Sequence, residues 1–333
     1  MTRITTSAAI AVLFATLFAG ITAATTPAAA QTWPTRPVTM VVPFGAGGSV
    51  DTMARVLAPR LSELLGQQVI IENVGGAGGM SGAARVAKAP PDGYQILLGN
   101  AGTQAISQTL YKRPLYNSVT DFVPVGLVAQ AYFVLVTNKN FPAATLPEFI
   151  AYAKVNQSRM QYASAGAGST SHMICALLDA AMGTHITHVP YRSTSIALPD
   201  MLAGRIDFIC DAVDSAAPLI KSNTVKAIAV LAPSRSTVLP DLPTAAEQGV
   251  PEVAVSGWYG LFLPTGTPEA IVRRLSSAAS AAMDTPSVRG RIETLGINMI
   301  APERRTPEFR DRFLPAEIAK WAIPIRASGL SME

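Results

Sequence analysis

The sequence has few charged residues, few cysteines and no long apolar run beyond its start, and each shortage excludes a class of protein. Of its 333 residues, 14% are charged and 49% are hydrophobic, which is typical of a globular chain and not of a disordered one. The 26 Lys and Arg residues are scattered, so no basic run predicts a face for nucleic acid. The formal net charge of +4 weakly favours an anionic small-molecule partner.

Cysteine is represented only by Cys175 and Cys210. A chain of this length can build a hydrophobic core without disulfides. The surrounding patterns predict a helix at Cys175 and a strand at Cys210. We interpret both as small buried residues and not as a disulfide, because spacing alone says nothing about their geometry.

The first 30 residues have the layout of a cleavable signal peptide. Arg3 precedes an apolar run at residues 8–21, and a small-residue segment then ends at Ala30. This pattern predicts cleavage between Ala30 and Gln31. The apolar run is shorter than the ~20 residues that span a bilayer, and no other segment reaches that length. We therefore expect the mature chain to be soluble, periplasmic and monomeric.

Residues 41–57, VVPFGAGGSVDTMARVL, carry the clearest functional signal. An apolar strand runs into a glycine-rich turn that opens directly onto a helix. Gly45, Gly47 and Gly48 allow a ligand to approach the main chain. The first helical turn offers unpaired N–H groups and the positive end of the helix dipole, which together favour a carboxylate or phosphate. The alternative is a turn that uses glycine only for close packing.

Alternating elements follow this stretch. We predict a helix from about Ser49 to residue 65, ended by Gly66, with a kink or restart at Pro59. A second strand at 67–73, a second glycine cluster at 74–82, a helix at about 81–89 and a third strand at 94–100 come next. This alternation predicts a doubly wound parallel sheet, whose ligands bind at the carboxyl ends of the strands.

A second copy of the opening element lies at residues 160–183. Its Gly166-Ala167-Gly168 matches Gly45-Ala46-Gly47, and His172 stands where Asp51 stands in the first copy. Apolar runs at 121–139 and 258–264 are interpreted as crossings between two lobes. We expect lobe 1 to comprise residues 31–131 and 258–333, and lobe 2 residues 132–257. Capping boxes are expected at Thr145 with Glu148 and at Thr244 with Glu247.

Several motifs appear in one order along the whole mature chain: VVPFGAGGSVD, IENVGGAGG, PPDGYQILLGN, SAGAGSTSH, HVPYR, DMLAGRIDF and GWYGLFLPTGTP. In these motifs and their order the chain resembles the Bug (Bordetella uptake gene) family. Its members are extracytoplasmic substrate-binding receptors of tripartite tricarboxylate transporters. The resemblance implies a type II periplasmic-binding-protein fold, an α/β structure of two lobes that are each a doubly wound sheet flanked by helices.

The resemblance also implies a function and a site. The function is capture of a small carboxylate by main-chain N–H groups of two glycine-rich loops, residues 44–51 and 165–172, and its delivery to membrane permease subunits. No cofactor, metal or enzymatic activity is implied. The residues expected to bind the ligand are Phe44, Ala46, Gly47, Gly48, Asp51, Ala77, Gly78, Ser164, Gly166, Gly168, Ser169, Thr170, His172, Tyr191, Arg192 and Asp211.

The chain departs from the family pattern at three places. Val74 and Gly75 replace the usual Arg-Pro before the GAGG turn, and Ala176 replaces a glutamate. Arg192 and Ser193 replace a Lys-Gly pair, and the planar guanidinium of arginine suits a second carboxylate. These changes affect the identity of the ligand and leave the expected fold unchanged.

The same residues allow other interpretations. Ser171 and His172 suggest an exported hydrolase, but no G-x-S-x-G elbow is present, and helix capping is favoured. His185 and His188 lack further residues at metal-ligand spacing, so solvent or strand-edge positions are expected. A sensor for a membrane signalling protein would share the same fold and pocket. Trp258 and Tyr259 could line the cleft, although packing is favoured.

Overall fold

The computed structural model describes residues 33–307 and 310–333. The expected signal peptide and its cleavage position lie outside these residues. Arg36–Glu333 forms one compact unit, and everything below concerns that unit. Within the described ranges, no helix combines the length and the apolar character needed to cross a membrane.

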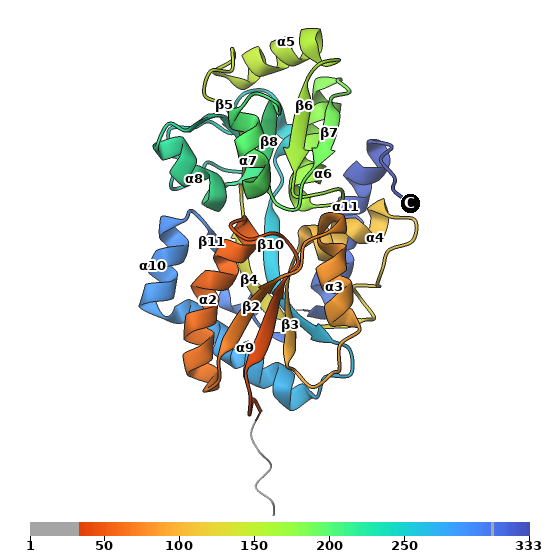
Figure 1. The fold of residues 1–333 in the computed structure, drawn as a ribbon, viewed down its shortest axis with the longest axis vertical. Coiled ribbons are helices and arrows are strands. Elements are labelled where there is room, and N and C mark those ends of the chain that lie inside the picture. Colours follow the sequence, from red (N-terminus) through yellow and green to blue (C-terminus); the bar gives the residue numbers. More distant parts are fainter. Residues whose placement is uncertain (1–32, 308–309) are drawn as a thin grey trace, which may run out of the picture. The chain divides into compact units, whose positions relative to one another are not determined.

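A mixed sheet organises lobe 1 (Figure 1). In the described part of the chain it has six strands in the order β11-β4-β10-β3-β1-β2. Strand β1 pairs in parallel with β2 and β3, as the sequence predicts, whereas β10 runs antiparallel to β3 and β4. The strands are β1 (Val38–Val42), β2 (Val69–Asn73), β3 (Gln95–Asn100), β4 (Phe122–Ala131), β10 (Gly257–Pro264) and β11 (Asn298–Met299).

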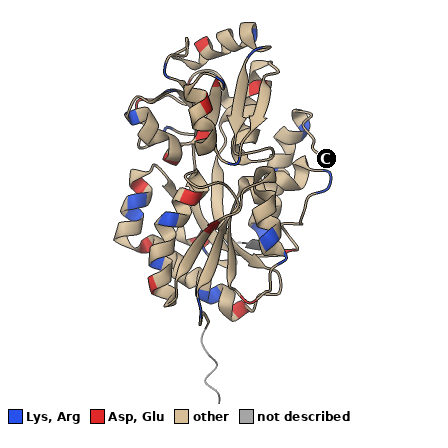
Figure 2. Cartoon of the chain, in the orientation of Figure 1, with Lys and Arg blue, Asp and Glu red and all other residues tan. Residues whose placement is uncertain are grey.

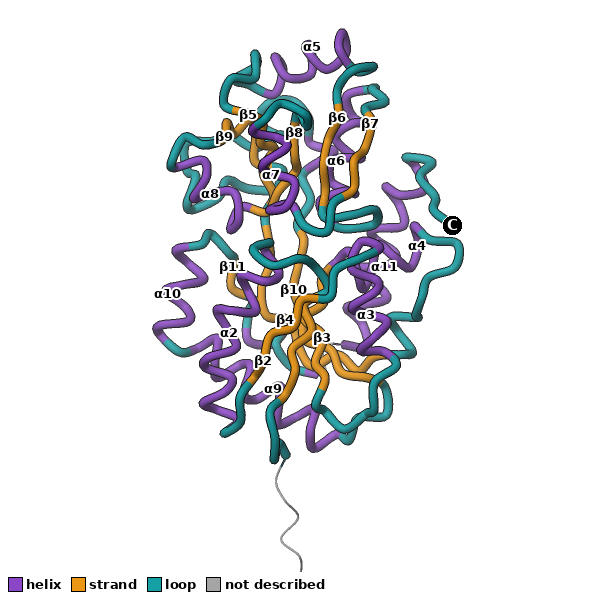
Figure 3. Tube along the Cα trace, in the orientation of Figure 1, coloured by secondary structure: helices purple, strands orange, loops and turns teal. Residues whose placement is uncertain are grey.

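Helices cover this sheet, and the C-terminal helices are among them (Figure 3). They are α2 (Ser49–Leu65), α3 (Met80–Ala87), α4 (Ser107–Leu110), α9 (Glu269–Asp284), α10 (Pro286–Thr294) and α11 (Arg310–Ala327). A short 3-10 turn (Ala77–Gly79) precedes α3, and a π-helical turn (Gly102–Ile106) precedes α4.

Helix α2 shows how local sequence fixes an element. Gly66 ends it in the left-handed conformation and donates its N–H to the carbonyl of Ser62, as the glycine stop predicts. The helix does not restart at Pro59, because α2 continues through that residue, and the alternative of a kink there stays a prediction. Pro59 and Arg55, whose carbonyl loses its helical partner, are both exposed. Water can satisfy the freed carbonyl there, so the proline is tolerated.

Lobe 2 is built on a second mixed sheet. Among the described residues it has five strands in the order β7-β6-β8-β5-β9, with β6 parallel to β7 and β8 and with β5 antiparallel to β8 and β9. The strands are β5 (Phe133–Asn138), β6 (Gln161–Ser164), β7 (Thr187–Pro190), β8 (Phe208–Ala212) and β9 (Val225–Val230). The helices are α5 (Leu146–Asn156), α6 (Thr170–Met182), α7 (Thr194–Leu202) and α8 (Val213–Lys221). Met201 and Ile209 belong to the buried apolar cluster of this lobe.

The chain changes sheets at two places. Only Tyr132 separates β4 in the first sheet from β5 in the second, and the chain re-enters the first sheet at Gly257. Crossing strands join the sheets antiparallel to their neighbours, so the sheets are mixed and not purely parallel.

The two cysteines form a disulfide, and the interpretation of unpaired buried residues is wrong. Cys175 lies on α6 and Cys210 on β8, and their sulfur atoms are bonded. Helix α6 packs directly on β8 and brings the two Cα atoms to 5.5 Å. The sequence separation of 35 residues gave no sign of this approach.

The two capping boxes have different outcomes. At Thr145 and Glu148 the reciprocal hydrogen bonds start α5. At Thr244 and Glu247 the same bonds form, with N···O distances of 2.7 and 3.1 Å. The chain there makes only a turn, which ends at Gly249 with φ of +91°. Pro251, two residues further on, cannot donate the N–H that a longer helix would need.

Candidate functional site

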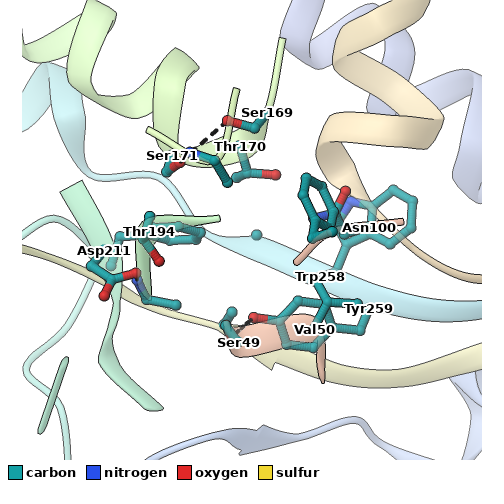
Figure 4. A pocket seen from close by; sticks show the side chains of 16 residues that line it. Ser49, Val50, Asn100, Ser169, Thr170, Ser171, Thr194, Asp211, Trp258 and Tyr259 are labelled. Carbon is teal, nitrogen blue, oxygen red and sulfur yellow. Dashed lines mark hydrogen bonds between the residues drawn. The ribbon is translucent and has the colours of Figure 1, made fainter. Parts of the chain in front are cut away.

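A cavity lies between the two sheets, and most of the residues that line it are buried (Figure 4). Its volume is about 50 Å³. On a scale where a single water needs ~10–15 Å³, it has room for a small solute. Both lobes contribute to its lining of 16 residues, which are Phe44, Ser49, Val50, Asn100, Ala131, Phe133, Ala165, Ser169, Thr170, Ser171, Thr194, Asp211, Ala212, Gly257, Trp258 and Tyr259.

Helix N-termini converge on this cavity from both lobes. Ser49 and Val50 are the first residues of α2, and Thr170 and Ser171 are the first of α6. Thr194 opens α7, and Ala212 immediately precedes α8. The N–H groups of a first helical turn have no partner within their helix, and the dipole places partial positive charge there. The cavity therefore suits an anion, although no basic side chain is among its described lining residues.

The two strand–turn–helix units that position these helices match each other in geometry. Gly47 and Gly168 both adopt φ of +78°, in the region that favours glycine. The N–H of Gly47 donates to Asp51 Oδ2 at 2.9 Å, and the N–H of Gly168 donates to His172 Nδ1 at 3.1 Å. Each turn is thus tied to a side chain on the first turn of its own helix. The repeat recognised in the sequence is confirmed at the level of these bonds.

Because of these bonds, some N–H groups of the two turns cannot donate to a ligand. The N–H of Gly47 and that of Gly168 are already used, and the N–H of Gly166 donates to Ser164 Oγ at 3.1 Å. Within the described residues, the main-chain N–H groups of Val50 and Ser171 have no hydrogen-bond partner in the protein. The groups left for a ligand therefore belong to the helix starts and not to these glycines.

Asp51 holds its own loop together. It is buried and accepts hydrogen bonds from Arg55, from the N–H of Gly47 and from the amide of Asn73. Burial by itself would raise the pKa of Asp51, but the three hydrogen bonds outweigh it and lower the pKa below its usual value. The carboxylate therefore stays charged and fixes the turn that precedes α2.

Four of the residues expected from the sequence line the cavity: Phe44, Ser169, Thr170 and Asp211. The others lie outside its lining, and these are Ala46, Gly47, Gly48, Asp51, Ala77, Gly78, Ser164, Gly166, Gly168, His172, Tyr191 and Arg192. The phenol of Tyr191, for example, donates to Asp200 at 2.6 Å, and neither residue lines the cavity.

Part of this second group joins the lobes beside the cavity. The N–H of Gly45 donates to the carbonyl of Arg192 at 3.0 Å, and Ser195 Oγ donates to the carbonyl of Ala46 at 3.0 Å. On the other side Gly78 lies against the carbonyl of Ala167, which also accepts a hydrogen bond from Tyr111 Oη at 3.0 Å. The lobes are therefore in contact on both sides of the cavity.

Two buried carboxyl groups lie at the lobe 2 side. Asp211 lines the cavity, and burial raises its pKa. Asp214 accepts a hydrogen bond from Ser49 Oγ of lobe 1 at 2.6 Å, and Ser49 also contacts the hydroxyl of Tyr259. Burial, together with the neighbouring Asp211, raises the pKa of Asp214 to about 7. Figure 2 shows that basic residues lie on helices of both lobes, but the described lining contains none.

The histidines of lobe 2 form a stacked pair. The rings of His172 and His188 lie 4.0 Å apart, and His188 also hydrogen-bonds Ser164 Oγ at 2.7 Å. Burial lowers the pKa of His172 to about 4 and that of His188 to about 3, so both rings are neutral at pH 7. His188 lies on the edge strand β7 and His185 is exposed, as expected. No group of described residues has the side chains to hold a metal ion.

The arrangement does not support the hydrolase reading. Ser171 Oγ accepts the N–H of Ala165 at 2.9 Å, and His172 Nδ1 accepts the N–H of Gly168. In the described part of the chain these two side chains share no hydrogen bond, so Ser171 lacks the adjacent base that a nucleophile requires.

Sequence reasoning missed several lining residues. Trp258 and Tyr259 were interpreted as packing residues, yet they are buried and line the cavity. Asn100 ends strand β3, so the rule that ligands lie at carboxyl ends of strands could have identified it. Ala131, Phe133, Thr194, Ala212 and Gly257 come from the crossings and from helix starts that carry no glycine signal.

Most of the chain matches one protein family. Residues 53–330 match the model of the tripartite tricarboxylate transporter family receptor. The periplasmic binding protein BugD has a similar structure, with a TM-score of 0.88 and 36% identity over 90% of this chain and 100% of that one. MatC from Rhodopseudomonas palustris, solved with bound malate, has a TM-score of 0.85 and 39% identity over 88% of this chain and 100% of its own. Rpa4515 of R. palustris, solved with adipate, has a TM-score of 0.85 and 34% identity over 90% of this chain and 99% of its own.

Proposed function

The chain belongs to the tripartite tricarboxylate transporter receptor family, and from this premise we propose that it captures a small carboxylate between its lobes and passes it to membrane permease subunits of such a transporter. The family is one of binding proteins and not of enzymes. Related proteins with the same fold were solved with malate and with adipate. Both of those ligands are small carboxylates, which supports the ligand class proposed for this chain.

One observation carries the proposal: helix starts from both lobes meet at one small cavity that is lined without a basic side chain among the described residues. The N–H groups of Ser49 and Val50 would hold a carboxylate from lobe 1, and those of Thr170 and Ser171 from lobe 2. Hydrogen bonds to a charged acceptor contribute roughly 1.5–3 kcal/mol each. Two such bonds from each lobe would join the lobes through the ligand.

Closure of the lobes follows from the same geometry. A ligand that is held by both helix starts stabilises the state in which the loops at Gly45 and Gly78 contact lobe 2. Hinge closure of this kind excludes water and strengthens each hydrogen bond inside the cavity. We propose that the hinge lies at the two sheet crossings, at residues 131–132 and 257–258, which are the lobe boundaries expected from the sequence.

The protein would act in the periplasm after removal of residues 1–30, as a monomer. Delivery to the permease requires that the closed, loaded form and the open form be distinguishable by that partner.

A thermal-shift screen of the purified protein tests the ligand class. A ligand that binds only the folded state raises the melting temperature according to its affinity and concentration. We expect shifts with small carboxylates such as malate, succinate and adipate and none with their neutral diamides. A shift with sugars or amines, without any shift from a carboxylate, would refute the proposal.

Proline substitution tests the role of the helix starts. Proline at the first helical position removes one N–H and is tolerated there, and Gly48 and Ser169 have the extended ψ angles, 173° and 160°, that a following proline needs. Ser49→Pro should weaken carboxylate binding beyond Ser49→Ala, and Thr170→Pro beyond Thr170→Val. Both variants of each pair lack the same hydroxyl group, and only the proline variant also lacks the main-chain N–H. Equal affinity within both pairs would exclude these N–H groups as donors.

A further inference from the structure

A cluster of three polar side chains joins the lobes next to the cavity. Ser49 opens α2 in lobe 1, Asp214 lies in the first turn of α8 in lobe 2, and Tyr259 follows the sheet crossing at Gly257. Ser49 Oγ donates to the carboxyl group of Asp214 and lies 2.6 Å from both of its oxygens. Ser49 Oγ also contacts Tyr259 Oη, as Figure 4 shows. The cluster therefore ties the start of α2 to lobe 2 beside the proposed hinge.

The surroundings of Asp214 are buried and contain a second acid. Asp214 and Tyr259 are each 3% exposed. The titratable groups that face Asp214 are the carboxyl group of Asp211, at the end of β8, and the phenol of Tyr259. Two carboxyl groups and a phenol thus lie together at the contact between the lobes, and an ionised Asp214 would have little water around it.

No cation compensates this carboxyl group. Among the elements that pack on α8 are α2, β5, β8 and β9. Each arginine of α2 pairs with an acidic residue of the same helix, and β5 carries no titratable residue. Lys226 of β9 donates to the carbonyls of Phe141 and Ala143. Over residues 33–307 and 310–333, no ion pair includes Asp214.

Closure of the lobes changes the acidity of Asp214. In the closed arrangement burial, followed by the charge of Asp211, raises its pKa from 3.8 to about 7, although the hydrogen bond from Ser49 acts in the opposite direction. Opening parts α2 from α8 and admits water, which returns the pKa toward its ordinary value. A carboxylate in the cavity, which Ser49 and Asp211 line, adds negative charge and favours the protonated acid further.

We propose that Asp214 is a positioning residue, acting through Ser49, which takes up one proton from the solvent when the lobes close on a carboxylate. The neutral acid keeps the hydrogen bond from Ser49 and leaves no bare charge at the contact between the lobes. This inference rests on the proposed function and adds regulation by pH to it. A group whose pKa is higher in the closed state binds a proton on closure, so affinity is highest at low pH and falls as pH rises through the pKa of the closed state.

Calorimetric titrations with malate, succinate and adipate between pH 6 and pH 8.5 test this inference. If the pKa changes from 3.8 in the open state to about 7 in the closed state, affinity should fall about tenfold over this range. Titrations in buffers of different ionisation enthalpy should show uptake of about 0.9 proton per ligand at pH 6 and less than about 0.1 at pH 8.5.

Asp214→Asn is the matched variant, because its amide has the shape of the neutral acid and still accepts from Ser49. Its affinity should be independent of pH apart from the ionisation of the ligand itself, which contributes equally in both proteins. Asp207→Asn is the control. Asp207 accepts the N–H of Gln161 at 2.7 Å within lobe 2, and burial raises its pKa as well. Closure does not alter that contact, so the control should keep the full dependence on pH.

Each outcome supports or overturns the inference. Constant affinity without proton uptake in the unsubstituted protein would overturn it and leave carboxylate binding intact, and this result requires no variant to fold. Retention of proton uptake in Asp214→Asn would exclude Asp214 as the acceptor, and loss of the uptake in Asp207→Asn would do the same. Failure of all three carboxylates to bind at pH 6 would refute the proposed function together with this inference.

Discussion

Replacement of Gly78 by alanine should block closure of the lobes. A Cβ atom at this position would lie 1.9 Å from the carbonyl oxygen of Ala167 in lobe 2. Real Cβ atoms do not approach another heavy atom more closely than 3.0 Å, so the two loops must separate by at least 3.0 − 1.9 = 1.1 Å. The obstacle on both sides is main chain, and no flexible side chain can move out of the way.

A separation of this size weakens hydrogen bonds that cross between the lobes. The bond from Tyr111 Oη to the carbonyl of Ala167, 3.0 Å long, lies beside the contact. Loss of this bond and of one bond between protein and ligand carboxylate would cost about 2–4 kcal/mol together. Ligand affinity should therefore fall about 30-fold or more.

Gly183→Ala is the matched control. Gly78 and Gly183 have φ of +62° and +67°, so alanine is strained to a similar degree at both, by about 1–2 kcal/mol. No heavy atom lies within 4 Å of a Cβ at Gly183. Both variants should lose stability, but only Gly78→Ala should lose affinity in calorimetry and fail to contract on ligand addition in small-angle scattering. If Gly78→Ala binds and contracts like the control, the contact between these loops is not part of the bound state.

The remaining predictions concern stability and its dependence on pH. The pKa values of His172 and His188 are lowered to about 4 and about 3 in the folded protein. As pH falls, these histidines therefore bind protons in the unfolded chain before they do so in the folded protein. Stability should therefore be full above pH 6.5 and fall by about 2–4 kcal/mol between pH 6.5 and pH 5. Thermal melting should show this loss, and His188→Gln should reduce the slope. The contribution of Asp214 to stability depends on pH in the opposite direction. Its pKa is raised to about 7, so the stabilisation from its protonated form is lost as pH rises from 3.8 to 7. Asp214→Asn should accordingly melt higher relative to the unsubstituted protein at pH 8 than at pH 5, by an amount worth about 2–3 kcal/mol. An unchanged difference between the two pH values would show that the pKa of Asp214 is not raised. Removal of the disulfide by Cys175→Ser with Cys210→Ser should cost about 3–4 kcal/mol in urea unfolding, given the 35-residue separation. No change in the urea midpoint would contradict the bond.

Local sequence predicts most of the fold because the elements are fixed by neighbours in the chain. The glycine stop at Gly66 and the capping box at Thr145 act within one helical turn, and both are found. The restart predicted at Pro59 failed because exposure, which depends on the packed lobe, decides whether a freed carbonyl is satisfied. The interpretation of the two cysteines as unpaired failed for a similar reason, since the disulfide depends on how α6 lies on β8.

The site was predictable in part, for the same physical reason. The two strand–turn–helix units are local patterns, and each contributes helix-start residues to the cavity, Ser49 and Thr170 among them. Thr194 and Tyr259 come from segments without a glycine signal and meet the site only through the two sheet crossings. Sequence also could not show that the N–H of Gly47 is used by Asp51, because that bond depends on the turn geometry.

The central claim is that a carboxylate is held by the helix starts inside the cavity. The most direct measurement is a pair of calorimetric titrations of the unsubstituted protein, one with the tightest carboxylate from the screen and one with its primary amide, which has nearly the same shape. The account predicts that the amide binds at least about 100-fold more weakly, because two or more charge-assisted hydrogen bonds are lost. Equal affinity for the acid and the amide would contradict it.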